Sequence, residues 1–261
     1  MSILSAGIYQ FDVIRGDGDK NVQTAFNGIS RLIRQGAELL VLPEMWSSGF
    51  DYSALAKHAA RTPEILAALS GTAAKNAVII AGSLPEADGE KIYNTLYVVD
   101  KKGEIAGKYR KTHLFPLIEE DKYFCGGDRP VVCETDCGRL GLMTCYDLRF
   151  PEFCRSLAIK GAEIVVISAQ WPASRIHHWD TLLAARAIEN QLFLVAANRY
   201  GAEDGLAFNG HSQIVSPTGE VLFLAASADM TAAASIDLKE IERFRSQFNC
   251  LGQRIPAVYG L

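Results

Sequence analysis

Short apolar runs of strand length alternate along the chain with stretches in which apolar residues recur at helical spacing. Strands are predicted at 3–11, 37–44, 77–84, 91–100, 104–109, 140–144, 161–168, 192–198, 212–216, 220–225 and 232–236. Helices are predicted at 21–35, 52–69 (interrupted near Pro63), 149–159, 179–191 and 238–244. A polar loop is expected at 12–20 and a long charged loop at 116–130.

This order of elements is typical of an α/β protein whose helices cover its sheets. No linker, low-complexity tract or short repeat interrupts the sequence, so we expect a single domain over residues 1–261. The tail at 246–261 is polar and then ends in Pro-Ala-Val-Tyr-Gly-Leu. We expect this tail to dock on the body of the domain or on a partner subunit.

Composition and charge narrow the function classes. A hydrophobic content of 49% and a charged content of 21% are ordinary for a soluble globular protein. The formal net charge of -4, without any basic run, argues against nucleic-acid or anionic-membrane partners. No apolar stretch reaches the roughly 18–20 residues that span a bilayer, and the N-terminus lacks the features of a secretory signal. We therefore expect a cytoplasmic protein without a membrane segment.

Six cysteines could suggest a disulfide framework or a metal site. In an unexported chain of this size they are expected to be reduced thiols. Five lie close together in sequence: Cys125, Cys133, Cys137, Cys145 and Cys154. They contain no C-x2-C pair and no histidine lies among them, so neither structural zinc nor another cofactor is expected. A non-enzymatic, metal-binding module built on this cluster is kept as the alternative.

Several predicted strands end in residues suited to chemistry, namely Glu44, Lys111, Cys145 and Trp171. Ligands of open α/β sheets gather at the carboxyl ends of strands, so we expect these four residues in one pocket.

Cys145 is the candidate nucleophile, because it lies where a predicted strand gives way to a predicted helix. At such a corner the strand holds the side chain, and backbone N–H groups at the helix start face an anion formed beside it. A lone cysteine is more often a buried structural residue. Here, however, polar residues crowd behind it, which favours a site: Tyr146, Asp147, Arg149 and Glu152.

The remaining candidates are weak when taken singly. Glu44 could be a surface carboxylate, Lys111 part of a solvated basic face, and Glu120 an exposed loop residue. Together they can serve one reaction: a carboxylate takes the thiol proton, and an ammonium favours the thiolate and stabilises an oxyanion. His113 lies two residues past Lys111 and could compete for the role of base, although it reads more simply as a strand-flanking residue.

Three segments resemble the signatures of the nitrilase (carbon–nitrogen hydrolase) superfamily, in order. They are Leu42-Pro43-Glu44, Gly107-Lys-Tyr-Arg-Lys111-Thr-His-Leu-Phe115 and Cys145-Tyr-Asp-Leu-Arg-Phe-Pro-Glu152. The resemblance implies a four-layer α-β-β-α sandwich that pairs into an eight-layer homodimer. It also implies a catalytic set of Glu44, Lys111 and Cys145, with Glu120 at the place of an assisting glutamate.

The resemblance implies hydrolysis of a small non-peptide amide through a cysteine thioester, with release of ammonia. Segments around Phe50 and Trp171 most resemble the omega-amidase branch, which cleaves terminal amides of short 2-oxo dicarboxylic acids. N-carbamoyl amino acid hydrolases share an arginine at the position of Arg149 but usually have Asn in place of Tyr146. That activity is the alternative, and nitrile hydrolysis is less favoured.

The expected pocket also contains substrate contacts. Arg149 lies one helical turn past Cys145, and its guanidinium can bind a carboxylate in a fork. The backbone N–H of Tyr146 is expected to hold the oxyanion, and Trp171 and Phe50 to form apolar walls. Alternatively, Arg149 pairs internally with Glu152 or Asp147, and the sequence leaves both interpretations open.

Overall fold

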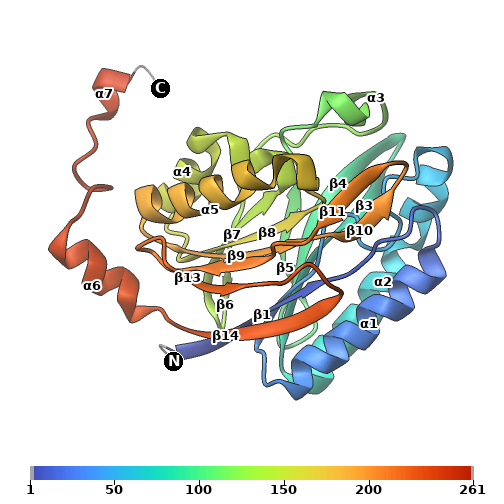
Figure 1. The fold of residues 1–261 in the computed structure, drawn as a ribbon, viewed down its shortest axis with the longest axis horizontal. Helices are drawn as coiled ribbons and strands as arrows, with labels where there is room; N and C mark the ends of the chain where they lie inside the picture. Colours follow the sequence, from blue (N-terminus) through green and yellow to red (C-terminus); the bar gives the residue numbers. More distant parts are fainter. Residues whose placement is uncertain (1–2, 260–261) are drawn as a thin grey trace.

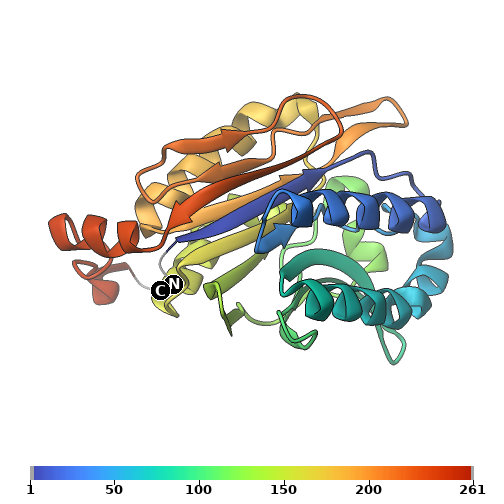
Figure 2. The same cartoon turned by 90° about the horizontal axis from the view of Figure 1, so that it is seen from below.

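The computed structural model describes residues 3–259, which form two six-stranded sheets packed face to face between helices. The helices α1 and α2 cover the outer face of one sheet, and α4 and α5 cover the outer face of the other (Figures 1 and 2). This is the predicted α-β-β-α layering. Among the described residues, no helix combines the length and apolar character needed to cross a membrane.

The first half of the chain builds the first sheet, whose strand order is β14-β1-β2-β3-β4-β5. Its elements are β1 (Ile3–Gln10), α1 (Gly18–Arg34), β2 (Leu39–Val41), η1 (Tyr52–Ala54), α2 (Leu55–Asn76), β3 (Ile79–Asp88), β4 (Lys91–Val99), β5 (Ile105–Arg110), η2 (Pro116–Ile118) and α3 (Glu120–Tyr123), where η marks a 3₁₀ helix.

The second half builds the second sheet, with the order β13-β12-β9-β8-β7-β6. Its elements are β6 (Val132–Thr135), β7 (Gly138–Thr144), η3 (Cys145–Arg149), α4 (Pro151–Ile159), β8 (Ile164–Ala169), η4 (Ala173–Arg175), α5 (Ile176–Asn190), β9 (Phe193–Asn198), β10 (Tyr200–Glu203), β11 (Leu206–Asn209), β12 (Gln213–Val215) and β13 (Val221–Leu224). The chain then returns to the first sheet with β14 (Met230–Asp237) and ends in α6 (Lys239–Gln247) and α7 (Pro256–Tyr259).

The centre of each sheet consists of three parallel strands, β1-β2-β3 in the first and β7-β8-β9 in the second. These strands are buried on both faces, which explains their near-continuous apolar sequences. Because β4 and β5 are successive antiparallel hairpin strands, β5 again runs parallel to β3. The carboxyl ends of β2, β5, β7 and β8 therefore carry the residues that build the site below.

Two helix predictions need correction. The helix α1 begins at Gly18 instead of 21, because the Asp17 carboxylate accepts a hydrogen bond from Lys20 N at 3.2 Å and caps it. The helix α2 is not interrupted at Pro63 and continues to Asn76. A proline inside a helix removes one backbone hydrogen bond, and burial of the Ile65 and Leu69 face against the sheet offsets that loss.

Other boundaries also differ from the sequence predictions. The predicted helix at 149–159 is split into η3 and α4, because Pro151 holds Phe150 in an extended conformation. The charged loop at 116–130 contains the short helices η2 and α3. The strand β3 extends to Asp88, and β6 and the β10–β11 hairpin were not predicted.

The tail lies only partly on the body. Arg245 donates to the Asn190 and Gln191 carbonyls at the end of α5, and Leu251 packs against the core. Farther along, Ile255 and Val258 are exposed, and α7 projects away from the sheets (Figure 1). Residues 260–261 of the tail lie outside the described residues, so docking of the whole tail stays a prediction.

Most of the extra cysteines are packing residues. Cys133, Cys137 and Cys154 are buried in the main apolar core. Burial raises the pKa of Cys133 and of Cys137 to about 11 and that of Cys154 to about 12. These three residues are therefore neutral thiols near neutral pH and poorly suited to oxidation. Cys125 and Cys250 are half-buried.

The packing of α1 on β1 yields a stability prediction. A Cβ on Gly28 would lie 2.1 Å from the Tyr9 ring, whereas one on Gly71 in α2 would meet nothing within 4 Å. We expect Gly28→Ala to lower the free energy of unfolding by about 1–3 kcal/mol through overpacking. Gly71→Ala, the matched control, should raise it by about 0.5–1 kcal/mol. Urea unfolding checks both, and a neutral Gly28→Ala would contradict the close approach of α1.

Candidate active site

The predicted strand-end residues lie together around one cavity. Its lining comes from both sheets and from the loops beyond them: Glu44, Phe50, Lys111, Phe115, Ile118, Cys145, Tyr146, Arg149, Gln170, Trp171, Pro172 and Arg175. The structure thus brings together seven of the eight predicted site residues. The eighth, Glu120, contacts Lys111 and does not line the cavity.

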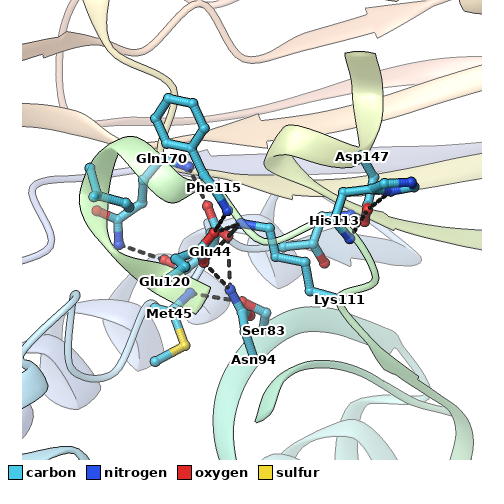
Figure 3. A network of polar contacts seen from close by, with 12 residues as sticks. Glu44, Met45, Ser83, Asn94, Lys111, His113, Phe115, Glu120, Asp147 and Gln170 are labelled. Atoms are coloured by element: carbon cyan, nitrogen blue, oxygen red, sulfur yellow. Dashed lines mark hydrogen bonds and ion pairs between the residues drawn. The ribbon is translucent and has the colours of Figure 1, made fainter. Parts of the chain in front are cut away.

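A buried ammonium joins two buried carboxylates at the floor of the site (Figure 3). Lys111 Nζ donates to Glu44 Oε1 at 2.8 Å and to the two Glu120 carboxylate oxygens at 2.9 and 2.7 Å. All three side chains are at most 1% exposed. The interpretations of Lys111 as part of a solvated face and of Glu120 as an exposed loop residue are therefore wrong.

Further donors hold the carboxylates in place. Asn94 Nδ2 donates to Glu44 Oε1 at 2.8 Å, and the backbone N–H of Gln170 donates to Glu44 Oε2 at 3.1 Å. The backbone N–H of Phe115 donates to Glu120 Oε2 at 2.6 Å. Each buried oxygen therefore has a partner, as burial of charge requires.

The charges around Lys111 favour its protonated form. Burial alone would lower the pKa of its ammonium, but the Glu120 and Glu44 carboxylates outweigh burial and raise that pKa well above its ordinary value. Burial raises the pKa of Glu120, Lys111 opposes the rise, and the charge of Glu44 adds to it. Lys111 is therefore a fixed positive charge.

Cys145 follows β7 and begins η3 with a φ of 44°, a left-handed conformation that is uncommon for residues other than glycine. Burial and then the Glu44 charge raise the pKa of its thiol, while Lys111 lowers it. The resting state of Cys145 is therefore the thiol.

Arg149 does not pair with Glu152 or Asp147. Its guanidinium lies over the Trp171 ring, with the guanidinium carbon 4.5 Å from the ring centre, and both Nη atoms donate to His178 Nδ1 at 3.3 Å. Asp147 is occupied by other donors. Of the two interpretations that the sequence left open, the internal ion pair is excluded.

Sequence reasoning missed three polar contributors. Asn94 and Gln170 hold Glu44 and come from β4 and from the residue after β8. Arg175 is a second guanidinium at the cavity, 5.8 Å from the centre of the Phe115 ring. The segment Tyr93-Asn-Thr-Leu, which also resembles the superfamily, contained a signal for Asn94. Nothing in the local pattern distinguished Arg175 from an ordinary surface arginine.

His113 does not compete as a base at the cavity, since its ring points to Asp147, at 2.8 Å (Figure 3). Over residues 3–259, no three His, Cys, Asp or Glu side chains are grouped as a metal ion would require. The cysteine-cluster alternative therefore gains no support from the described part of the chain.

A two-sheet α/β sandwich with a thiol, a carboxylate and an ammonium in one cavity defines a thiol hydrolase type of site. The profile described as carbon–nitrogen hydrolase matches residues 5–246, and the chain belongs to this family. A 2-oxoglutaramate amidase of Bacillus subtilis (strain 168) is 40% identical over 240 residues, which cover 90% of this chain and 92% of the relative. The recognition made from the three signature segments is thus confirmed.

Solved structures confirm the fold. A carbon–nitrogen hydrolase from Helicobacter pylori G27 superposes with a TM-score of 0.93 at 29% identity, covering 99% of this chain and 97% of that chain. A mutant amidase from Nesterenkonia sp. AN1 does so with a TM-score of 0.87 at 27% identity, covering 98% and 95%. That amidase has the acetamide moiety of fluoroacetamide attached covalently to its active-site cysteine.

The buried ion network predicts the consequence of removing its cation. In Lys111→Met, Glu44 and Glu120 would be buried without a counter-charge, which costs about 3–5 kcal/mol of unfolding free energy. Unpaired buried carboxyl groups bind protons more tightly in the folded than in the unfolded state, so the loss should shrink as pH falls from 8 to 5. Urea unfolding across this pH range checks the prediction. A loss that grows toward acid pH would contradict the ionic arrangement.

Proposed function

We propose that this protein hydrolyses a small amide through a thioester on Cys145, with Glu44 as general base and Lys111 as oxyanion partner. The observation that carries the proposal is the convergence of these three groups on one cavity. The covalent adduct on the cysteine of the related amidase supports the choice of nucleophile. Glu120 has a supporting part, because it holds the ammonium of Lys111.

In the first half-reaction, Glu44 takes the Cys145 proton as the sulfur attacks the amide carbon. Lys111 and the backbone N–H of Tyr146 stabilise the resulting oxyanion. Glu44 then passes the proton to the nitrogen, the carbon–nitrogen bond breaks, and ammonia departs. The acyl group remains on Cys145 as a thioester. In the second half-reaction, Glu44 deprotonates a water molecule that attacks the thioester. The carboxylic acid is released and the thiol of Cys145 regenerated.

The best-supported substrates are ω-amides of short dicarboxylic acids, including 2-oxo acids. Arg149 and Arg175 both line the cavity. Among residues 3–259 their guanidinium groups contact aromatic rings and His178 and pair with no carboxylate. Burial lowers the pKa of Arg149, and the charge of Arg175 lowers it further, so an anion between them would be favourable. Phe50 and Trp171 give the cavity apolar walls that suit a short carbon chain. The Bacillus subtilis relative, a 2-oxoglutaramate amidase, supports the same class of substrate.

N-carbamoyl amino acids also have a distal carboxylate and are the alternative substrates. Tyr146, where hydrolases of that type usually have Asn, disfavours them. The family resemblance also supports a homodimer, and six free cysteines support a reducing, cytoplasmic location. Ammonia release from succinamic acid, 2-oxoglutaramate and N-carbamoyl-β-alanine decides between the substrate classes.

The nucleophile is tested by Cys145→Ala with Cys154→Ala as the matched control. We expect Cys145→Ala to abolish ammonia release and the acyl adduct that mass spectrometry detects on the wild-type enzyme. Cys154 lies in the core, so Cys154→Ala should lose some stability but keep most activity per folded molecule. An inactive Cys154→Ala together with an active Cys145→Ala would reverse the assignment.

Carboxylate recognition is tested by comparing succinamic acid with its methyl ester. Wild type should prefer the acid in kcat/KM, and Arg149→Ala should lose roughly 10- to 100-fold of that preference, because hydrogen bonds to charged groups contribute about 1.5–3 kcal/mol. Arg129→Ala is the control, since Arg129 is 79% exposed and pairs with Asp128 away from the cavity. Equal kcat/KM for acid and ester in wild type would shift the substrate to a neutral amide.

A further inference from the structure

Asp147, two residues beyond Cys145, is a fully buried carboxylate that the proposed chemistry does not use. Its side chain nevertheless accepts four hydrogen bonds. Oδ2 accepts from the Tyr109 hydroxyl at 2.7 Å and from Thr144 N at 2.9 Å. Oδ1 accepts from the His113 backbone N–H at 3.1 Å and from its ring Nδ1 at 2.8 Å (Figure 3). A carboxylate saturated with donors in this way has a defined position.

The donors come from both sheets. Tyr109 lies on β5 of the first sheet, and His113 follows the same strand. Thr144 ends β7 of the second sheet, directly before Cys145. Asp147 therefore connects the strand that carries the thiol to the segment that carries the ammonium.

Lys111 lies midway between the two first-sheet donors, two residues from each. Its own backbone N–H donates to the Asn94 carbonyl on β4 at 2.8 Å, which anchors it to its sheet. Asp147 holds the chain on either side of Lys111, so a shift of this carboxylate would move the ammonium relative to the sulfur.

The surrounding contacts keep the donors rigid. The His113 ring stacks on Phe150 with centres 3.6 Å apart and planes within 9°. The Tyr109 hydroxyl also accepts from Thr112 N at 3.0 Å. Burial, together with the Asp147 charge, raises the pKa of Tyr109 well above its ordinary value, so its hydroxyl stays a donor.

We propose that Asp147, through Tyr109 and His113, is a positioning residue that sets the placement of the Lys111 ammonium against the Cys145 thiol. The inference rests on the proposed amidase chemistry for its kinetic meaning. A misplacement of about 1 Å at a reacting centre can cost on the order of 10²-fold in rate. Since a carboxylate only accepts, Nδ1 of His113 carries a proton and donates. His113 is therefore one of the donors that hold Asp147 in place.

The test combines four variants at three positions of this connection with a control outside it. Asp147→Asn replaces an acceptor oxygen with a donor, and Tyr109→Phe removes one donor. His113→Leu removes the ring donor, whereas His113→Asn keeps a donor near the position of Nδ1. Tyr97→Phe is the control, because Tyr97 is a buried tyrosine on neighbouring β4 whose hydroxyl makes no hydrogen bond with the described residues. Each variant is measured for kcat and KM with succinamic acid, for Tm, and for the rate at which iodoacetamide alkylates Cys145.

We expect Asp147→Asn to lower kcat by about 10²-fold and His113→Leu and Tyr109→Phe by about 10-fold, with little change in KM. The alkylation rate should fall most in Asp147→Asn and less in His113→Leu and Tyr109→Phe. The reason is that the Lys111 charge lowers the thiol pKa of Cys145, so a displaced Lys111 leaves less thiolate to react. His113→Asn should restore kcat toward wild type with an unchanged pH profile, and Tyr97→Phe should behave as wild type.

Three results would overturn the inference. Variants with a lower Tm but wild-type kcat and alkylation per folded molecule would make Asp147 merely structural. A His113→Asn variant as impaired as His113→Leu, with one limb of the pH profile missing, would make His113 an acid or base. If Asp147→Asn does not fold, unaltered kcat in both Tyr109→Phe and His113→Leu overturns the inference. Failure of wild type to hydrolyse any amide would instead refute the proposed function, while alkylation rates would still test the placement of Lys111.

Discussion

The arrangement on which the site depends is one ammonium buried between two carboxylates. Neither Glu44 nor Glu120 could lie inside the protein without Lys111, and Lys111 could not without them. A buried ion network of this kind is weak evidence for stability. It does hold a charge in a fixed position with little reorganisation, which suits a group that stabilises an oxyanion. Burial and, after it, the charge of Glu44 raise the pKa of the Cys145 thiol, whereas Lys111 lowers it, and the sulfur is protonated at rest.

The two-sheet architecture makes this arrangement possible. Each sheet has three parallel central strands, so their carboxyl ends form one edge from which loops can carry functional side chains. The first sheet supplies the charges at the ends of β2 and β5, and the second supplies the thiol at the end of β7. The left-handed backbone of Cys145 and the contacts of Asp147 lie at this junction. A left-handed non-glycine residue and a buried carboxylate therefore lie next to the cavity.

Much of the fold could be predicted from hydrophobic patterning. The central strands are apolar because both faces are buried, and their number and order along the chain came directly from that pattern. The failures have common causes. The path of α2 through Pro63 and the extension of β3 to Asp88 depend on neighbouring elements that local propensity does not include. The β10–β11 hairpin has a single buried residue, Phe208, and no strong apolar signal.

By itself the sequence determined the layered α/β class and the family. It also predicted the candidate site residues Glu44, Lys111 and Cys145, because each follows a strand and lies in a recognisable segment. Tertiary structure alone decided the burial of Glu120, the support of Glu44 by Asn94 and Gln170, and the choice of Trp171 and His178 as neighbours of Arg149. The physical reason is the separation along the chain of the residues that each kind of information involves. Periodicity reports which face of an element is buried, whereas hydrogen bonds and charge pairing depend on residues from distant elements that only the packed sheets bring within about 3 Å.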